Sequence, residues 1–200
     1  MDLYTQLEEL QGMTRLLIDD VILLRPTIGE GNPDPSSNEK ANRRFFIRAV
    51  FALVEAFMEQ HRRLLVHLCQ SGKIELKERT LNRLREIKQI LDEQTGAVVG
   101  EEPRYMQMFD KVKIVYKAAA AGFGQPLAVT CGDERWPTFK SAMETRNQIT
   151  HPKNVQDCWI FEQDLQNVIA AHDWFRALQN EFVRVAREHR ERNRGLPTSW

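Results

Sequence analysis

Apolar residues recur three or four positions apart along almost the whole chain, and the alternating pattern of a half-buried strand is hard to find. This spacing places apolar side chains on one face of an α-helix and polar side chains on the other. The pattern therefore predicts an all-α protein, built as an up-and-down bundle of about six helices.

The expected helices are separated by segments that contain proline and glycine, which favour loops. We expect helices over residues 2–24, 36–69, 75–95, 103–121, 137–150 and 159–192. Ser36 and Glu39 have the capping-box spacing that begins a helix. Gly96 is expected to end the third helix, and Pro103 to lie in the first turn of the fourth. The stretch FFIRAVFALVEAF, residues 45–57, is apolar around most of its circumference, which predicts a central helix.

The chain length sets the expected number of domains. Two hundred residues, 42% of them hydrophobic, are enough for one sizeable core, so we expect a single domain over residues 1–200. Residues 1–35 would form an added N-terminal helix and loop, and residues 36–195 the core bundle. The apolar stripe of the first helix is expected to pack on the bundle or at a dimer interface.

Charge and cysteine usage exclude several classes of protein. Lys+Arg and Asp+Glu number 28 each, so a polyanion site would have to be a local basic patch. We find no signal-peptide pattern and no apolar run of about 18 residues, so we expect no membrane partner. Cys69, Cys131 and Cys158 are an odd number without CxxC pairs, which favours a reducing cytoplasm, and they lack zinc-site spacing, so we expect no metal. We interpret them as small hydrophobes, with a reactive thiol as the alternative.

The stretch ETRNQITHPK, residues 144–153, brings together Arg146, Asn147 and His151, with Pro152 directly after the histidine. Proline disfavours helical dihedrals in the preceding residue, so the helix should end at or just before His151. The imidazole is then released from helical geometry and can turn back toward Arg146.

Two other pairs share the five-residue spacing from arginine to histidine, and they serve as internal controls. These control pairs are Arg62 with His67 and Arg184 with His189. On an uninterrupted helix, residues five apart are separated by about 140°, so both pairs should point to different faces. The second pair lies in the arginine-rich segment RVAREHRERNRG, which either complements the helix dipole or contacts RNA.

The three motif residues together suit phosphodiester chemistry. An arginine binds anions through a permanent charge, a histidine titrates near neutrality, and an asparagine amide can orient either one. Histidine would move protons while the guanidinium stabilises charge on the phosphoryl oxygens. The alternative is an ordinary helix end at His151, with Arg146 paired to Glu144 or a neighbouring acid.

The residues Arg146-Asn147-x-x-x-His151 resemble the R-N-x-x-x-H motif of HEPN (higher eukaryotes and prokaryotes nucleotide-binding) ribonucleases. The context is similar too, because the motif ends the penultimate helix and FEQDLQNVIAAHDWF follows in the last. The segment RRFFIRAVFALVEAF resembles the family's first core helix. The resemblance covers roughly residues 37–185, and the six-residue motif is its only specific part.

The resemblance implies that His151 acts in acid–base catalysis, Arg146 stabilises the phosphate and Asn147 positions them. It also implies a homodimer with two motifs facing one composite RNA cleft. The reaction would be attack by the RNA 2′-hydroxyl, which leaves a cyclic phosphate and needs neither metal nor cofactor. One toxin subgroup carries a tyrosine two residues after the histidine, whereas this chain has Lys153, which we expect to contact RNA.

Three hypotheses therefore follow from the sequence. The first is a homodimeric endoribonuclease in defence, toxin or RNA-processing biology, with an antitoxin or another regulatory protein as a further partner. The second is a non-catalytic module of the same fold that binds RNA, a nucleotide or a protein, which the neutral net charge favours. The third is a helical scaffold in which the motif is coincidental.

Overall fold

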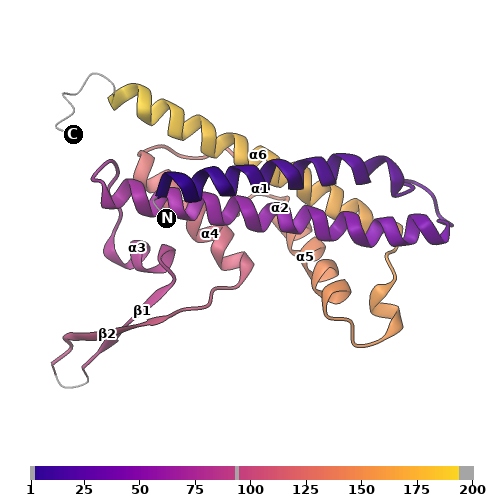
Figure 1. Cartoon of the computed structure of the whole chain (residues 1–200), viewed down its shortest axis with the longest axis horizontal. Helices are drawn as coiled ribbons and strands as arrows, with labels where there is room; N and C mark the ends of the chain where they lie inside the picture. Colours follow the sequence, from indigo (N-terminus) through magenta and orange to yellow (C-terminus); the bar gives the residue numbers. More distant parts are fainter. Residues whose placement is uncertain (1–2, 93–94, 194–200) are drawn as a thin grey trace. The chain divides into compact units, whose positions relative to one another are not determined.

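The computed structural model describes residues 3–92 and 95–193, and the side chains of residues 3–7 lie outside this description. Within these ranges the chain is mainly α-helical, which confirms the expected all-α class (Figure 1). The helices are α1 Leu3–Leu24, α2 Ser37–Gln70, α3 Glu78–Leu84, α4 Met108–Phe123, α5 Trp136–Thr150 and α6 Glu162–Asn193. Two short 3-10 helices, η1 Arg25–Thr27 and η2 Val155–Cys158, and two strands, β1 Ile87–Leu91 and β2 Val98–Pro103, complete the fold.

The backbone contacts divide the chain into two compact units. Unit 1 comprises Met1–Phe57 and Gly132–Ala177, and unit 2 comprises Met58–Cys131 and Leu178–Trp200. The long helices α2 and α6 contribute residues to both units. The single domain over residues 1–200 stays a prediction.

Unit 1 has an aromatic core formed by α2, α5 and α6. Phe139 of α5 is fully buried, and its ring lies 6.1 Å from that of Phe51 and 4.9 Å from that of Trp174. The Trp174 indole N–H donates to Asp133 Oδ2 at 3.0 Å, so the polar edge of this buried ring is satisfied. This packing fixes α5, the helix that carries the Arg146 motif.

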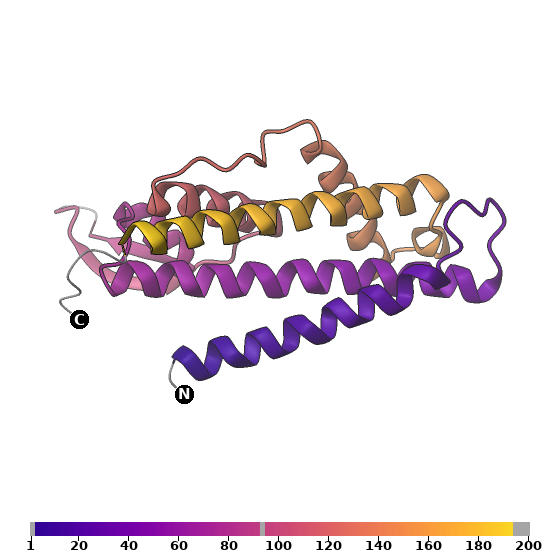
Figure 2. The same cartoon turned by 90° about the horizontal axis from the view of Figure 1, so that it is seen from above.

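The start of α2 is fixed by its capping box and by the loop that precedes it. The Ser36 amide donates to Glu39 Oε2 at 2.8 Å, and the Glu39 amide donates to Ser36 Oγ at 3.3 Å, as the sequence predicts. Figure 2 shows how the loop after α1 turns back into α2. In α1, Leu10 and Val21 of the expected stripe are buried, whereas Leu17 and Leu24 are half-buried. Residue 2 and the side chains of Leu3 and Leu7 lie outside the description.

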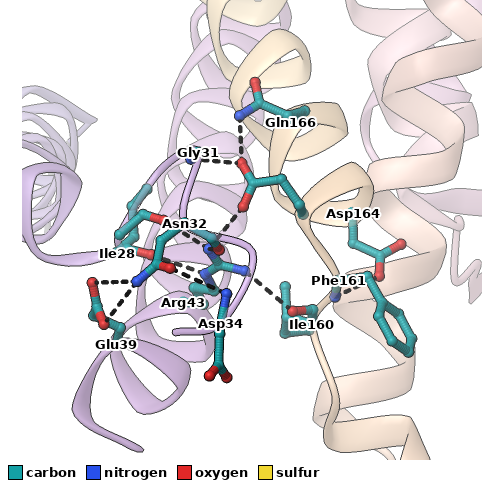
Figure 3. A network of polar contacts seen from close by, with 12 residues as sticks. Ile28, Gly31, Asn32, Asp34, Glu39, Arg43, Ile160, Phe161, Asp164 and Gln166 are labelled. Carbon is teal, nitrogen blue, oxygen red and sulfur yellow. Dashed lines mark hydrogen bonds and ion pairs between the residues drawn. The ribbon is translucent and has the colours of Figure 1, made fainter. Parts of the chain in front are cut away.

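Arg43 of α2 fixes that loop from inside unit 1. Its side chain is only 1% exposed, and its guanidinium donates to the carbonyl oxygens of Ile28, Gly29 and Asn32 at 2.9, 2.7 and 3.1 Å. It also pairs with Glu162 of α6 at 2.7 Å (Figure 3). The buried charge is therefore compensated, and Arg43 joins the α1–α2 loop to the start of α6.

Unit 2 has its own buried ring cluster. His61 of α2 stacks on Phe182 of α6 with ring centroids 3.6 Å apart, and it meets Tyr116 of α4 edge-on at 6.1 Å. Burial lowers the pKa of His61 to about 3, because a charged imidazole would lose its hydration there. His61 is therefore a neutral part of the core at physiological pH.

The third expected helix, residues 75–95, is wrong in its second half. Helix α3 ends at Leu84, and Glu86 adopts a positive φ of 55°, which a continuing helix does not allow. Strand β1 then pairs antiparallel with β2, and Gly96, at φ 68°, lies in the connection between them rather than at a helix end. Pro103 closes β2 instead of opening a helix, and α4 begins only at Met108.

None of the helices in the described part of the chain is both long and apolar enough to span a membrane.

Candidate functional site

Helix α5 ends where the motif predicts. Thr150 is its last residue, and His151 follows with φ −129° and ψ 59°, outside helical geometry. The His151 amide still donates to the Asn147 carbonyl at 3.0 Å, and the Thr150 hydroxyl donates to the Arg146 carbonyl at 2.7 Å. The histidine therefore lies directly after a well-formed last turn, as expected from Pro152.

Arg146 is held by a carboxylate on a different helix. Its Nη2 lies 2.7 Å from Glu55 Oε1 of α2, and its Nη1 donates to the Asn147 side-chain oxygen at 3.1 Å. The Arg146 side chain is 26% exposed and that of Glu55 is 48% exposed, so solvent reaches this pair. Pairing of Arg146 with an acid belongs to the alternative interpretation of the motif, and the acid is Glu55 of α2 rather than Glu144.

His151 does not share this hydrogen-bonded group. Its side chain is exposed, and no described residue forms a hydrogen bond with its imidazole. The Asn147 amide oxygen accepts from Arg146 rather than from the histidine. The structure thus joins Arg146 to Asn147 and places His151 at the same helix end, with an imidazole open to solvent.

Lys153 belongs to a short loop whose backbone is well anchored. Its amide donates to Asp157 Oδ2 at 2.7 Å, and Asn154 and Asp157 form a reciprocal capping box at the start of η2. No ion pair of its ammonium group is present in the described part of the chain, and the side chain is exposed. The backbone position of Lys153 is therefore fixed by the loop, while its side-chain charge faces solvent.

Two charged residues of α2 belong to this site and were missed by the sequence interpretation. Arg48 Nη2 donates to the Ile149 carbonyl at 2.8 Å, in the last turn of α5, and Glu55 binds Arg146 one α5 turn earlier. Arg48 and Glu55 are seven residues apart, which places them on the same helix face. The signal was present, because they are the only charged residues within the apolar segment 45–57.

Both arginines of the control pairs, and His189, bind other residues within unit 2. Arg62 pairs with Glu59 at 2.7 Å and donates to the Leu84 carbonyl. Arg184 pairs with Glu181 and Glu188, and His189 Nε2 lies 3.0 Å from the Lys73 carbonyl oxygen. Neither pair lies at the end of its helix before a proline.

The C-terminal arginine segment also makes contacts within unit 2. Arg192 Nη2 donates to the Phe123 carbonyl at 2.8 Å, at the C-terminal end of α4, and Arg184 Nη2 donates to the Pro126 carbonyl at 3.3 Å. These bonds satisfy carbonyl groups that helix and loop ends leave free. They favour the structural interpretation of this segment over the RNA-contacting one.

The site as a whole offers two guanidinium groups, an ammonium group and an open imidazole around one helix end, with Glu55 as the opposing carboxylate. Such a set can bind a phosphate and exchange protons with it. Comparison of the chain with protein-family models, with curated proteins and with solved structures finds no match.

Proposed function

We propose that this chain is a metal-independent endoribonuclease of the HEPN type, active as a homodimer. The observation that carries the proposal is the end of α5. There the exposed His151 follows directly on the turn that holds Arg146 and Asn147. Such an enzyme would act in defence, toxin or RNA-processing biology under a regulatory protein such as an antitoxin.

In the proposed reaction, the RNA 2′-hydroxyl attacks the adjacent phosphorus. A neutral His151 takes the hydroxyl proton, the 2′-oxygen bonds to phosphorus, and the bond to the 5′-oxygen breaks. A protonated His151 from the second copy gives a proton to that 5′-oxygen, so the products are a 2′,3′-cyclic phosphate and a 5′-hydroxyl. Arg146 stabilises the charge on the phosphoryl oxygens, Asn147 positions the guanidinium, and Lys153 contacts the RNA backbone.

A second candidate is a binding module of the same fold without catalysis. The Arg146–Glu55 ion pair at 2.7 Å favours it, because the carboxylate neutralises the guanidinium that a phosphate would otherwise bind. For the enzyme to act, an RNA phosphate would have to displace Glu55 from Arg146, or Glu55 would have to hold Arg146 beside the phosphate. Only a cleavage assay separates this module from the enzyme.

The test is RNA cleavage in EDTA by the parent chain and by motif variants. His151→Ala should lose most activity, since a general acid–base group contributes about 10²- to 10⁴-fold. Arg146→Lys should also fail, because an ammonium group cannot replace the two-pronged guanidinium. Asn147→Ala should cost less, and Lys153→Ala should weaken binding more than turnover. New 5′-hydroxyl ends, detected by enzymatic phosphorylation, identify the reaction.

His67→Ala and His189→Ala are the matched controls, because each removes a histidine with the same spacing from an arginine. Both should retain cleavage within a few-fold of the parent, and thermal melting of every variant should show a folded chain. Intact cleavage by His151→Ala would remove the enzymatic proposal. Loss of cleavage in His189→Ala alone would place the chemistry elsewhere.

A further inference from the structure

Two large aromatic side chains are exposed just beyond the motif. Trp159 is 56% exposed and Phe161 is 65% exposed, on the segment between η2 and α6. The residue between them, Ile160, is half-buried, and its carbonyl accepts a 3.5 Å hydrogen bond from buried Arg43. Exposed apolar side chains that lie close together are candidates for an interaction site.

The exposure pattern of the segment directs both rings to solvent, with the half-buried Ile160 between them. Trp159 has φ −85° and ψ 128°, which is extended, and side chains alternate between the two sides of an extended backbone. Ile160 therefore faces inward while Trp159 and Phe161 face solvent. In Figure 3 the Phe161 ring is directed away from the Arg43 network.

The ideal spacing of side chains two residues apart is close to the spacing that a stacked nucleobase needs. Residues two apart on an extended chain are separated by about 6.6 Å. A base stacked between two rings needs about twice the 3.4 Å rise of stacked bases, or about 6.8 Å. An extended backbone from Trp159 to Phe161 would thus space the two side chains for one planar base between them.

The segment that leads to the two rings is held by two arginines of α2. Arg43 holds the Ile160 carbonyl and Arg48 holds the Ile149 carbonyl, so both ends of segment 149–160 are anchored on α2. These two arginines are five residues apart, or about 7.5 Å along the helix axis. The segment is therefore a compact loop, with His151 two residues beyond its first anchor.

An exposed aromatic side chain and an arginine also lie on the same face of α2, next to the anchor of this loop. Phe45 is 54% exposed and lies three residues before Arg48, so the two share a helix face. Two acids near these rings are already engaged, because Asp157 of the loop accepts from the Lys153 amide and Asp164 in the first turn of α6 accepts from the Phe161 amide. Their charges are directed at the backbone and not at an incoming strand.

We propose that Trp159 and Phe161 form a stacking site for one unpaired base of single-stranded RNA, beside the phosphate bound at the end of α5. This proposal rests on the proposed function for the phosphate, and it adds the substrate class. A base inside a duplex is stacked on both faces and cannot enter, so the site selects unpaired RNA. Bases of every kind have a stacking face, so it selects little by sequence.

The test is binding of a 2′-O-methyl RNA oligonucleotide, which lacks the nucleophile and is not cleaved. Trp159→Ala and Phe161→Ala should each weaken its binding by at least about fivefold, since a stacked base contributes about 1–3 kcal/mol. Trp159→Phe should restore most of the affinity. Tyr105→Ala, which removes a side chain that is 87% exposed in unit 2, is the matched control and should bind like the parent.

A second arm compares the same oligonucleotide with an abasic one that keeps its phosphates and with a duplex of equal length. Both should bind the parent more weakly, and the Trp159→Ala substitution should change their binding little. Equal binding of abasic and normal strands, or equal affinities for the Trp159 and Tyr105 variants, would overturn the proposal.

Sedimentation of the same variants tests a different occupant of the two rings, which is a second copy of this chain. Loss of self-association in Trp159→Ala without loss of base-dependent binding would show a contact between copies and overturn it as well.

The two proposals fail separately in this design. Base-dependent binding through Trp159 with no cleavage of ordinary RNA would support the stacking site and remove the enzyme. Cleavage that depends on His151 with no effect of Trp159→Ala or Phe161→Ala would support the enzyme and remove the stacking site.

Discussion

At the scale of single residues, the contact between Arg146 and Glu55 bears most directly on the proposed binding of a phosphate. The carboxylate lies 2.7 Å from Nη2 and, like a phosphate oxygen, accepts from the guanidinium. Both side chains are open to solvent, so the pair contributes little to stability and can exchange partners. In the proposed function, Glu55 would therefore compete with a phosphate for Arg146, and it is not needed for stability.

Glu55→Gln should strengthen RNA binding, because it removes a negative charge beside Arg146 and leaves a neutral acceptor of similar shape. We expect a gain of about three- to tenfold at low salt, which shrinks as salt screens the charges. The free energy of unfolding should change by about 1 kcal/mol or less. Filter binding across a salt series, with urea unfolding of the same variant, measures both.

The matched control is Glu59→Gln, one helical turn further along α2. It releases Arg62 and Arg63, which Glu59 holds at 2.7 and 2.6 Å, so it changes the net charge by the same amount. Equal gains in the two variants would mean that only net charge matters. Unchanged binding in Glu55→Gln would show that Arg146 does not contact the phosphate.

The sequence predicts some of these residue contacts and not others, for a physical reason. Pro152 acts on its immediate neighbour, so the helix end at Thr150 and the exposed His151 follow from local geometry. The partner of Arg146 is 91 residues away, and nothing local specifies it. Trp159 and Phe161 lie in a stretch that the apolar spacing assigned to the last helix, so their exposure was not predicted.

At the scale of elements, Arg43 does more than any other polar residue described in unit 1 to join separate segments. Five acceptors surround its guanidinium, from the α1–α2 loop, the segment before α6 and α6 itself. An uncharged apolar side chain at position 43 would leave the buried carbonyl oxygens and the Glu162 carboxylate without their donor.

Arg43→Leu should lower the free energy of unfolding by about 3 kcal/mol, the lower end for breaking a buried ion pair. The lower end applies because the Glu162 side chain is 32% exposed and water can replace part of the contact. Urea unfolding measures the loss. Arg25→Gln, which breaks a solvent-exposed pair with Glu30 at 3.0 Å in the same loop region, is the control and should cost about 1 kcal/mol or less. Equal losses would mean that the buried network adds nothing.

Helix positions were predicted well where apolar spacing is long and well bounded, and poorly where it is short. Helices α1, α2 and α5 begin and end within about two residues of the expected positions. The segment 75–95 has leucines and isoleucines at helical spacing, but the hairpin pairs Ile87 with Pro103 and Lys88 with Glu102. Pairing with a segment beyond Gly96 overrides the local helical pattern, because the strand partner contributes hydrogen bonds that periodicity does not encode.

At the scale of the whole molecule, the balanced charge of 28 against 28 means that the chain has no general attraction for RNA. In the proposed function, RNA binding would then come from the local group at the end of α5 and the loop after it. One copy supplies a single imidazole there, whereas the proposed reaction uses one base and one acid. Two copies would supply both, in a cleft related by two-fold symmetry.

A mixing experiment tests this requirement directly. Parent chain is combined with a tenfold excess of His151→Ala chain, and exchange of subunits is verified by capture of a tag on one of them. RNA is kept in excess over both chains, so that substrate bound by the inactive chain does not limit the rate. Cleavage per parent chain should fall severalfold, because most parent chains then share a cleft with a copy that lacks the second imidazole. Unchanged cleavage per parent chain, with mixed pairs confirmed by capture, would show that each copy cleaves alone and that the acid for the 5′-oxygen comes from water or from another residue of the same chain.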